Sequence, residues 1–306
     1  MKSGHPTVTR YTALGMLAIV FWSTSIAFSR SLTEELGTLT TATYINLASG
    51  LIGSSYFIGK SKSIQKLLDT SIHYLTGCGA LFVAYMVCFY LAIGFSSGRR
   101  QALIVGMINY LWPSFTLVFS SPILHKKARI SLLPGIIIAT AGVFLAMIHT
   151  GPFSLEIFME NFRLNYIPYI LAFLASICWG LYSNLSRRWG GNVNFGAIPF
   201  FLLSTGLVLM AVGTFFFNVE TPRWTLNVAA QFSYVVIFPS LLSYVFWDMG
   251  VRKGDHTLLA SFSYLIPLLS TIFSSLYLQV TIGLLLWTSS FLVIAGAIIC
   301  KISILD

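Results

Sequence analysis

Ten apolar runs, each of about 18 to 22 residues, follow one another along this chain of 306 residues and limit its fold more than any other feature. Each run has the length that a helix needs to cross a bilayer core of roughly 30 Å. Only 9% of the residues are charged and the mean hydropathy is +0.82, whereas soluble domains carry roughly 25% charged residues. We therefore predict an all-α integral membrane protein with ten transmembrane helices.

Short connections separate most of these runs, so that consecutive helices become antiparallel neighbours and no soluble domain fits between them. The predicted spans are residues 12–31, 38–59, 74–96, 99–121, 131–148, 166–186, 196–217, 228–251, 255–277 and 284–302. Lys2 and Arg10 precede a first run that is too long for a signal peptide. We expect this run to remain in the protein as the first helix.

The distribution of basic residues predicts the orientation. If the N-terminus is inside, the inner segments contain thirteen Lys and Arg residues and the outer segments contain five. Because basic residues concentrate in cytoplasmic loops, both termini are expected in the cytoplasm. In a bacterium the protein would lie in the inner membrane, as a multi-pass protein.

Several classes of function and partner are disfavoured. The four cysteines all fall inside the apolar runs, where they pack as small side chains, so neither a disulfide nor a metal site is predicted. The net charge of +9 is scattered over short loops and forms no stripe typical of a nucleic-acid surface. The loops show no nucleophile–base pair and no phosphate-binding glycine loop. We predict no enzyme, no cofactor and no nucleic-acid partner.

An internal repeat appears at separations of 154 to 157 residues. The matched positions are Trp22 and Trp179, Ser29 and Ser186, Arg30 and Arg187, Gly94 and Gly250, Gly98 and Gly254, and Gly142 and Gly296. Each copy contains five helices, an odd number, so the second copy is upside down relative to the first. We predict two inverted five-helix repeats, residues 1–150 and 151–306, an arrangement typical of secondary transporters with a midplane substrate site.

Prolines interrupt two of the predicted helices. The stretch Gly106–Ser114 reads GMINYLWPS, and its Tyr, Leu and Pro recur 154 residues later in Ser263–Pro267. A proline inside a helix removes one hydrogen bond to the carbonyl four residues back, here Asn109 for Pro113 and Ser263 for Pro267. In a bilayer such interrupted backbone is tolerated where it is buried in protein or lines a wet cavity.

Aromatic residues accompany these interruptions near the middle of the membrane, away from the interfaces where Trp and Tyr usually gather. They lie roughly 14 to 20 Å from the starts of their helices at about 1.5 Å per residue. They are Trp22, Tyr85, Tyr110, Trp112, Trp179 and Tyr264. Two interpretations exist: hydrogen bonding within a packed core, or an aromatic cavity. We favour the cavity, with Asn109 and Ser263 added to the predicted substrate-binding residues.

Asp248 is the one acid clearly within a predicted span. The favoured interpretation is a structural pair with Arg252 one helical turn later. The alternative is a proton or cation coupling site, because an acid inside a membrane is a functional candidate. His256, at the start of the ninth helix, is interpreted as an interfacial residue, with a proton relay as the alternative.

Four short motifs carry a resemblance to a known family. They are GMINYLWPS at 106–114, FVAYMVC at 82–88, FWST at 21–24, and Ser263-Tyr264 followed by Pro267. With them the chain resembles the EamA-like drug/metabolite transporter superfamily, and within it the bacterial aromatic amino acid exporters. The resemblance implies a basket-shaped bundle open to one side and a central aromatic cavity for Phe, Tyr and Trp. It covers essentially the whole chain, but Asp248 stands where a neutral amide is expected.

The leading hypothesis is therefore a secondary transporter of aromatic amino acids and related solutes, which works by alternating access and exports its substrate. The alternative within the superfamily is a multidrug exporter of quaternary ammonium compounds, which would be expected to hold a carboxylate deep in an early helix. The first predicted helix has none. A membrane scaffold or receptor would have a continuous apolar core without mid-membrane prolines. A monomer is the default expectation.

Overall fold

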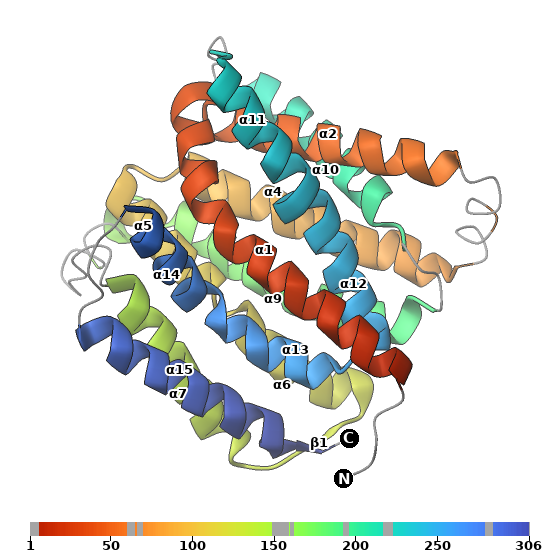
Figure 1. Ribbon diagram of the computed structural model, residues 1–306, viewed down its shortest axis with the longest axis vertical. Coiled ribbons are helices and arrows are strands. Elements are labelled where there is room, and N and C mark those ends of the chain that lie inside the picture. The colour runs from red at the N-terminus through yellow and green to blue at the C-terminus, as the bar shows by residue number, and fades with distance from the viewer. Residues whose placement is uncertain are drawn as a thin grey trace.

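The protein is a bundle of helices (Figure 1). The computed structural model describes residues 6–59, 65, 70–148, 159, 162–191, 196–216, 223–278 and 284–305. Within these residues the only strands are β1 (Lys127–Ala128) and β2 (Ile304–Leu305), which pair antiparallel. This small sheet joins the C-terminal end of the chain to the link between two helices in its first half.

The helical segments follow the predicted ranges. In the first half they are α1 (Pro6–Leu36), α2 (Thr38–Ile58), η1 (His73–Cys78), α4 (Gly79–Gly94), α5 (Arg99–Asn109), α6 (Trp112–Leu124) and α7 (Leu132–Ile148). In the second half they are α9 (Ile167–Trp189), α10 (Ile198–Phe216), α11 (Leu226–Val235), η2 (Val236–Leu242), α12 (Ser243–Lys253), α13 (His256–Phe262), η3 (Ser263–Leu265), α14 (Ile266–Leu278) and α15 (Leu284–Ser303). Each predicted span coincides with one helix or with one run of adjoining helical segments.

Several of these runs have the length and composition of membrane spans. Among the described residues, five are long and apolar enough to cross a membrane: His73–Gly94, Ile104–Leu124, Ile167–Trp189, Ile198–Phe215 and Leu226–Lys253. Shorter apolar helices cover Leu132–Leu145, His256–Ser270 and Trp287–Ser303. Large apolar side chains on the outside, such as Ile137 on α7 and Phe291 on α15, are 67% and 73% exposed. Such a surface is expected of a protein surrounded by lipid.

Prolines mark the places where helices change form. α5 ends at Asn109 and α6 begins at Trp112, so that Pro113 occupies the first turn of a new helix, where its missing N–H leaves no gap in the hydrogen bonding. Pro239 lies inside the widened turns of η2. Pro267 follows the short 3₁₀ segment η3 and is the second residue of α14. The predicted interruptions at Pro113 and Pro267 are thus present.

Four helix pairs make the most extensive contacts: α7 with α15, α2 with α10, α1 with α12, and α4 with α9. Figure 1 shows α7 beside α15 at one side of the bundle and α2 beside α10 at the other. Glycine permits the first of these approaches, because a Cβ on Gly142 would lie 2.8 Å from the backbone nitrogen of Val293. The start of α1 and the strand β2, which pairs with β1, lie toward the same end of the bundle (Figure 1).

Candidate functional site

A cavity of about 420 Å³ is lined by residues of α1, α2, α4, α5, α6, α9, α12 and α14. Six of the predicted substrate-binding residues line it: Trp22, Tyr85, Asn109, Tyr110, Trp112 and Trp179. Phe89, Tyr90 and Tyr244 add further aromatic rings to its wall, and none of its described lining residues is charged. We call this hollow the aromatic cavity.

Trp179 forms the centre of the aromatic packing at one end of the aromatic cavity. Its ring makes edge-on contacts with Trp22 and Trp112, at centroid distances of 5.8 and 6.1 Å, and lies 4.6 Å from the Tyr85 ring. Trp247, which is fully buried, lies behind it at 6.3 Å and meets Trp112 edge-on at 5.3 Å. Edge-to-face contacts of this kind add to the stabilisation that burial alone provides. They hold the cavity wall in a defined shape.

The indole N–H of Trp22 has a specific partner in this wall. It donates a hydrogen bond of 3.0 Å to the backbone carbonyl of Pro239. Pro239 belongs to η2, whose widened turns alter the regular α-helical ladder. The distortion at Pro239 therefore fixes the orientation of a cavity residue 217 positions away.

The interruption between α5 and α6 places two predicted residues in the aromatic cavity. Tyr110 and Leu111 form the turn, and the amide of Tyr110 still bonds to the carbonyl of Gly106 at 3.0 Å. Asn109, the last residue of α5, is only 6% exposed, and its side-chain carbonyl oxygen accepts no hydrogen bond among the described residues. A buried acceptor that lines a cavity is a ready partner for a donor group on a bound molecule.

Ser263 and Tyr264 lie elsewhere. The Tyr264 hydroxyl is 2.7 Å from the Ser114 hydroxyl, and the Tyr264 ring packs in a separate apolar cluster with residues of α6, α7 and α15. The Ser263 hydroxyl donates to the carbonyl of Ala260 at 2.7 Å, and the Ser263 carbonyl accepts from the amide of Ile266. The structure thus does not place these two residues among those that line the aromatic cavity.

Asp248 is fully buried beyond the aromatic packing. Its Oδ2 accepts hydrogen bonds from Arg252 Nε at 2.7 Å and from the Tyr74 hydroxyl at 3.1 Å, and its Oδ1 accepts one from the Tyr182 hydroxyl at 2.9 Å. The predicted pair with Arg252 is present. Arg252 Nη1 donates in addition to the carbonyls of Gly190 and of the next residue, at 3.1 and 3.2 Å.

These four side chains, Asp248, Arg252, Tyr74 and Tyr182, form what we call the carboxylate network. It ties α12 to η1, to α9 and to the link after α9. The two tyrosines were not singled out from the sequence. Tyr182 follows Trp179 by three residues and therefore lies on a neighbouring face of α9, which is a weak signal. Tyr74 carries none.

His256 is the first residue of α13 and is 1% exposed, so its side chain is buried at the end of that helix. It lines a different hollow from the aromatic cavity.

The aromatic cavity continues toward one end of the bundle. Thr33, Thr38 and Ile93 line both this cavity and a second hollow of about 560 Å³, which extends to Gly37 and Ser96 at the helix ends. These positions lie at the end opposite the described chain ends, because α1 begins at Pro6 and finishes near Thr33. In the other direction the path meets the aromatic packing and the carboxylate network. The aromatic cavity therefore borders another hollow at one end and packed side chains at the other.

Comparison with known proteins supplies the context for this cavity. Residues 10–148 and 166–301 match the profile of the EamA-like transporter family. Relatives named aromatic amino acid exporter YddG, from Escherichia coli and Salmonella typhimurium, are 27% and 29% identical, over 96% of this chain and 97% of theirs in each case. A solved crystal structure with 22% identity has the same fold, with a TM-score of 0.79 over 96% of this chain and 98% of the other.

Proposed function

Because the chain belongs to the EamA-like transporter family, and is thus a multi-pass membrane transporter rather than an enzyme, we propose that it exports aromatic amino acids and related small solutes. The observation that carries this proposal is the aromatic cavity, whose described wall is rich in Trp and Tyr and contains no charged side chain. The full-length similarity to proteins named as aromatic amino acid exporters supports the same substrate class.

The wall of the aromatic cavity suits a flat ring. Trp22, Trp112 and Trp179 present edges and faces at right angles to one another, so a bound aromatic side chain would meet both kinds of surface. Each such contact contributes about 0.5–1.5 kcal/mol beyond area burial. An aliphatic amino acid of similar size would gain the burial but not the directional contacts. Selection for aromatic rings follows from this difference.

The polar end of the substrate needs its own partners. The side-chain carbonyl oxygen of Asn109 would accept a hydrogen bond from the substrate ammonium group. The Ser25 hydroxyl, which also lines the cavity, donates to the backbone carbonyl of Trp22 at 2.7 Å and can still accept a hydrogen bond from the substrate. The backbone carbonyl of Ser263 already accepts a hydrogen bond from the amide of Ile266.

The mechanism is alternating access by two inverted repeats, residues 1–150 and 151–306, with ten membrane spans. The helix pairs support this symmetry. When each helix is replaced by its counterpart in the other repeat, the contact between α1 and α12 becomes the contact between α9 and α4. The contact between α2 and α10 and the contact between α7 and α15 each map onto themselves. Substrate would enter from one side and leave from the other as the two halves rock about the aromatic cavity.

We place both termini in the cytoplasm, with the protein in a bacterial inner membrane and acting as a monomer. The excess of Lys and Arg in the segments at the end that holds the described chain ends supports this orientation. The end of the aromatic cavity that borders the 560 Å³ hollow then faces outward, and the carboxylate network lies on the cytoplasmic side. A reporter domain that folds only in the cytoplasm, fused to the C-terminus, tests the orientation; loss of its signal with normal expression would contradict it.

The decisive experiment is uptake of radiolabelled Phe into proteoliposomes that contain the purified protein. We expect saturable uptake that unlabelled Trp and Tyr compete strongly and Leu competes weakly. Preloaded cells that express the protein should also release labelled Phe faster than cells without it. Absence of Phe transport in both assays would refute the proposal. Aromatic walls also attract cations, so transport of a quaternary ammonium compound in place of Phe would assign the protein to the multidrug alternative.

A further inference from the structure

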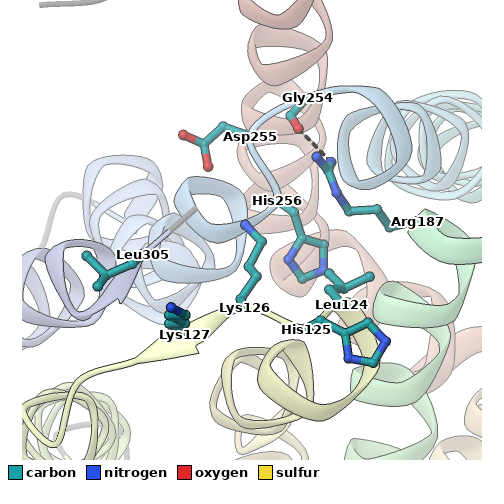
Figure 2. A pocket seen from close by; sticks show the side chains of 9 residues that line it. All are labelled: Leu124, His125, Lys126, Lys127, Arg187, Gly254, Asp255, His256 and Leu305. Atoms are coloured by element: carbon teal, nitrogen blue, oxygen red, sulfur yellow. Dashed lines mark hydrogen bonds between the residues drawn. The ribbon is translucent and has the colours of Figure 1, made fainter.

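A third hollow, separate from the aromatic cavity and from the 560 Å³ hollow beside it, has a volume of about 670 Å³ and lies near the described ends of the chain. It is formed by the C-terminal end of α6, β1, the last turns of α9, the link between α12 and α13, and β2 (Figure 2). None of the residues assigned to the aromatic cavity borders it. We call it the basic pocket.

Positive charge dominates the wall of the basic pocket. Among the described lining residues, Lys126, Lys127 and Arg187 are basic and one, Asp255, carries a carboxylate. Both oxygens of that carboxylate accept hydrogen bonds from Lys301 Nζ, at 3.0 and 2.7 Å. The negative charge of Asp255 is therefore already matched by a cation that is not among the pocket-lining residues, and the field inside the pocket remains positive.

The cationic groups of the basic pocket are held in place. Arg187 Nη1 donates to the backbone carbonyls of Val251 and Gly254 at 3.0 and 2.8 Å, which fixes the guanidinium against the end of α12. Lys126 Nζ donates to the Thr257 hydroxyl at 2.9 Å. In Figure 2 the Lys126 side chain rises from the β1 segment and His256 extends from the α13 side toward the same space. A ligand would thus meet donors that need little further ordering.

We propose that the basic pocket binds a phosphate-bearing anion, either a free phosphate group or the headgroup of an anionic lipid. A phosphate offers several acceptor oxygens and matches Lys and Arg donors on opposite walls. Basic pockets at the cytoplasmic face of helical membrane proteins suit lipid phosphates. The bound anion would connect the α6–β1 link, the end of α9 and the α12–α13 link. It would therefore stabilise this end of the bundle.

The test measures thermal unfolding of the full-length protein in neutral detergent. Inorganic phosphate is titrated at constant ionic strength with chloride as the replacement anion, and phosphatidylglycerol is compared separately with phosphatidylcholine. The pocket variant is Lys126→Gln/Lys127→Gln, and the matched control is Arg129→Gln/Lys253→Gln, which removes two charges at the same end outside the pocket. If the double variant does not fold, the single variant Lys127→Gln, at an exposed position, replaces it as the pocket variant.

We expect saturable stabilisation of the wild type and of the control, and an affinity at least about tenfold weaker in the pocket variant, because two charge-assisted contacts are lost. A response to inorganic phosphate identifies the free anion as sufficient, whereas a response to phosphatidylglycerol alone identifies the lipid headgroup. Equal stabilisation of the pocket variant and the control, or no stabilisation by either ligand, would overturn the proposal. This readout is independent of whether the protein transports amino acids.

Discussion

The aromatic cavity and the basic pocket are hollows of comparable volume, about 420 and 670 Å³, but their walls are chemically opposite. The described wall of the aromatic cavity holds Trp, Tyr and neutral polar groups and no charge. Among the described residues, the wall of the basic pocket holds three basic side chains, two of them fixed by hydrogen bonds, and one carboxylate. The difference shows where this fold tolerates charge: at the end of the bundle, and away from the space where we propose that substrate moves.

One helix connects the two hollows. α12 contributes Tyr244 to the aromatic cavity, Asp248 and Arg252 to the carboxylate network, and ends next to Gly254 in the basic pocket. Polarity therefore increases along three turns of a single helix. The carboxylate network lies between the two hollows, where the buried charges neutralise each other. Substitutions that remove a charge, an aromatic ring or a hydrogen bond in the aromatic cavity, the carboxylate network and the basic pocket should therefore have separable effects on stability and on substrate affinity.

The largest effect on stability is expected at the carboxylate network. Asp248→Asn leaves Arg252 buried without its counter-charge, which should reduce the free energy of unfolding by about 3–5 kcal/mol. Thermal unfolding in detergent measures the loss. The double variant Asp248→Asn/Arg252→Gln removes both charges and should recover part of the stability.

A proton-coupling role for Asp248 predicts a different result. The single variant would keep its stability, and uptake would lose its dependence on a pH gradient. That outcome would separate Asp248 from the structural role that the carboxylate network assigns to it.

The next largest effect concerns the wall of the aromatic cavity. Trp112→Ala removes a buried ring and its edge contacts with a bound substrate, and should lower the apparent affinity for Phe by about two orders of magnitude. Competition uptake in proteoliposomes measures this affinity. Trp287→Ala is the matched control, because Trp287 on α15 is 65% exposed and lies outside the cavity. Equal affinities in the two variants would remove Trp112 from the substrate site.

A smaller effect is expected at Asn109. Asn109→Leu keeps the volume but removes the carbonyl acceptor, so amino acid affinity should fall about tenfold, the loss typical of one hydrogen bond to a charged group. Asn46→Leu, at a buried position outside the cavity, controls for damage to packing. If Asn109→Leu binds Phe as tightly as the wild type, the ammonium group is recognised elsewhere.

The smallest effect is expected at the rim of the basic pocket. Lys301 and Asp255 form a 2.7 Å ion pair whose side chains are 31% and 28% exposed. Because solvent screens such a pair, Lys301→Gln should change the free energy of unfolding by less than about 1 kcal/mol. Thermal unfolding measures this as well. A loss of stability close to that of Asp248→Asn would mean that the rim of the basic pocket and the carboxylate network do not differ in the way described.

Which segments are helical, and how far each aromatic residue lies along its helix, follow from the order of residues in the chain. Apolar length marks the spans because the bilayer requires about 20 residues per helix. Pro113 and Pro267 mark the interruptions because proline lacks the N–H group. The depth of Trp22, Tyr85, Tyr110, Trp112 and Trp179 follows from the constant rise per residue. These quantities are local, and a local pattern is enough to predict them.

The direction in which each of those residues faces depends instead on how the helices pack against one another. Tyr264 has the expected depth, yet the rotation of its helix turns it toward Ser114 and away from the aromatic cavity. Tyr74 and Tyr182 reach Asp248 from 174 and 66 residues away. Helix rotation and long-range partners depend on how all the helices pack together. No single segment of the sequence carries that information, because packing is a property of pairs of surfaces.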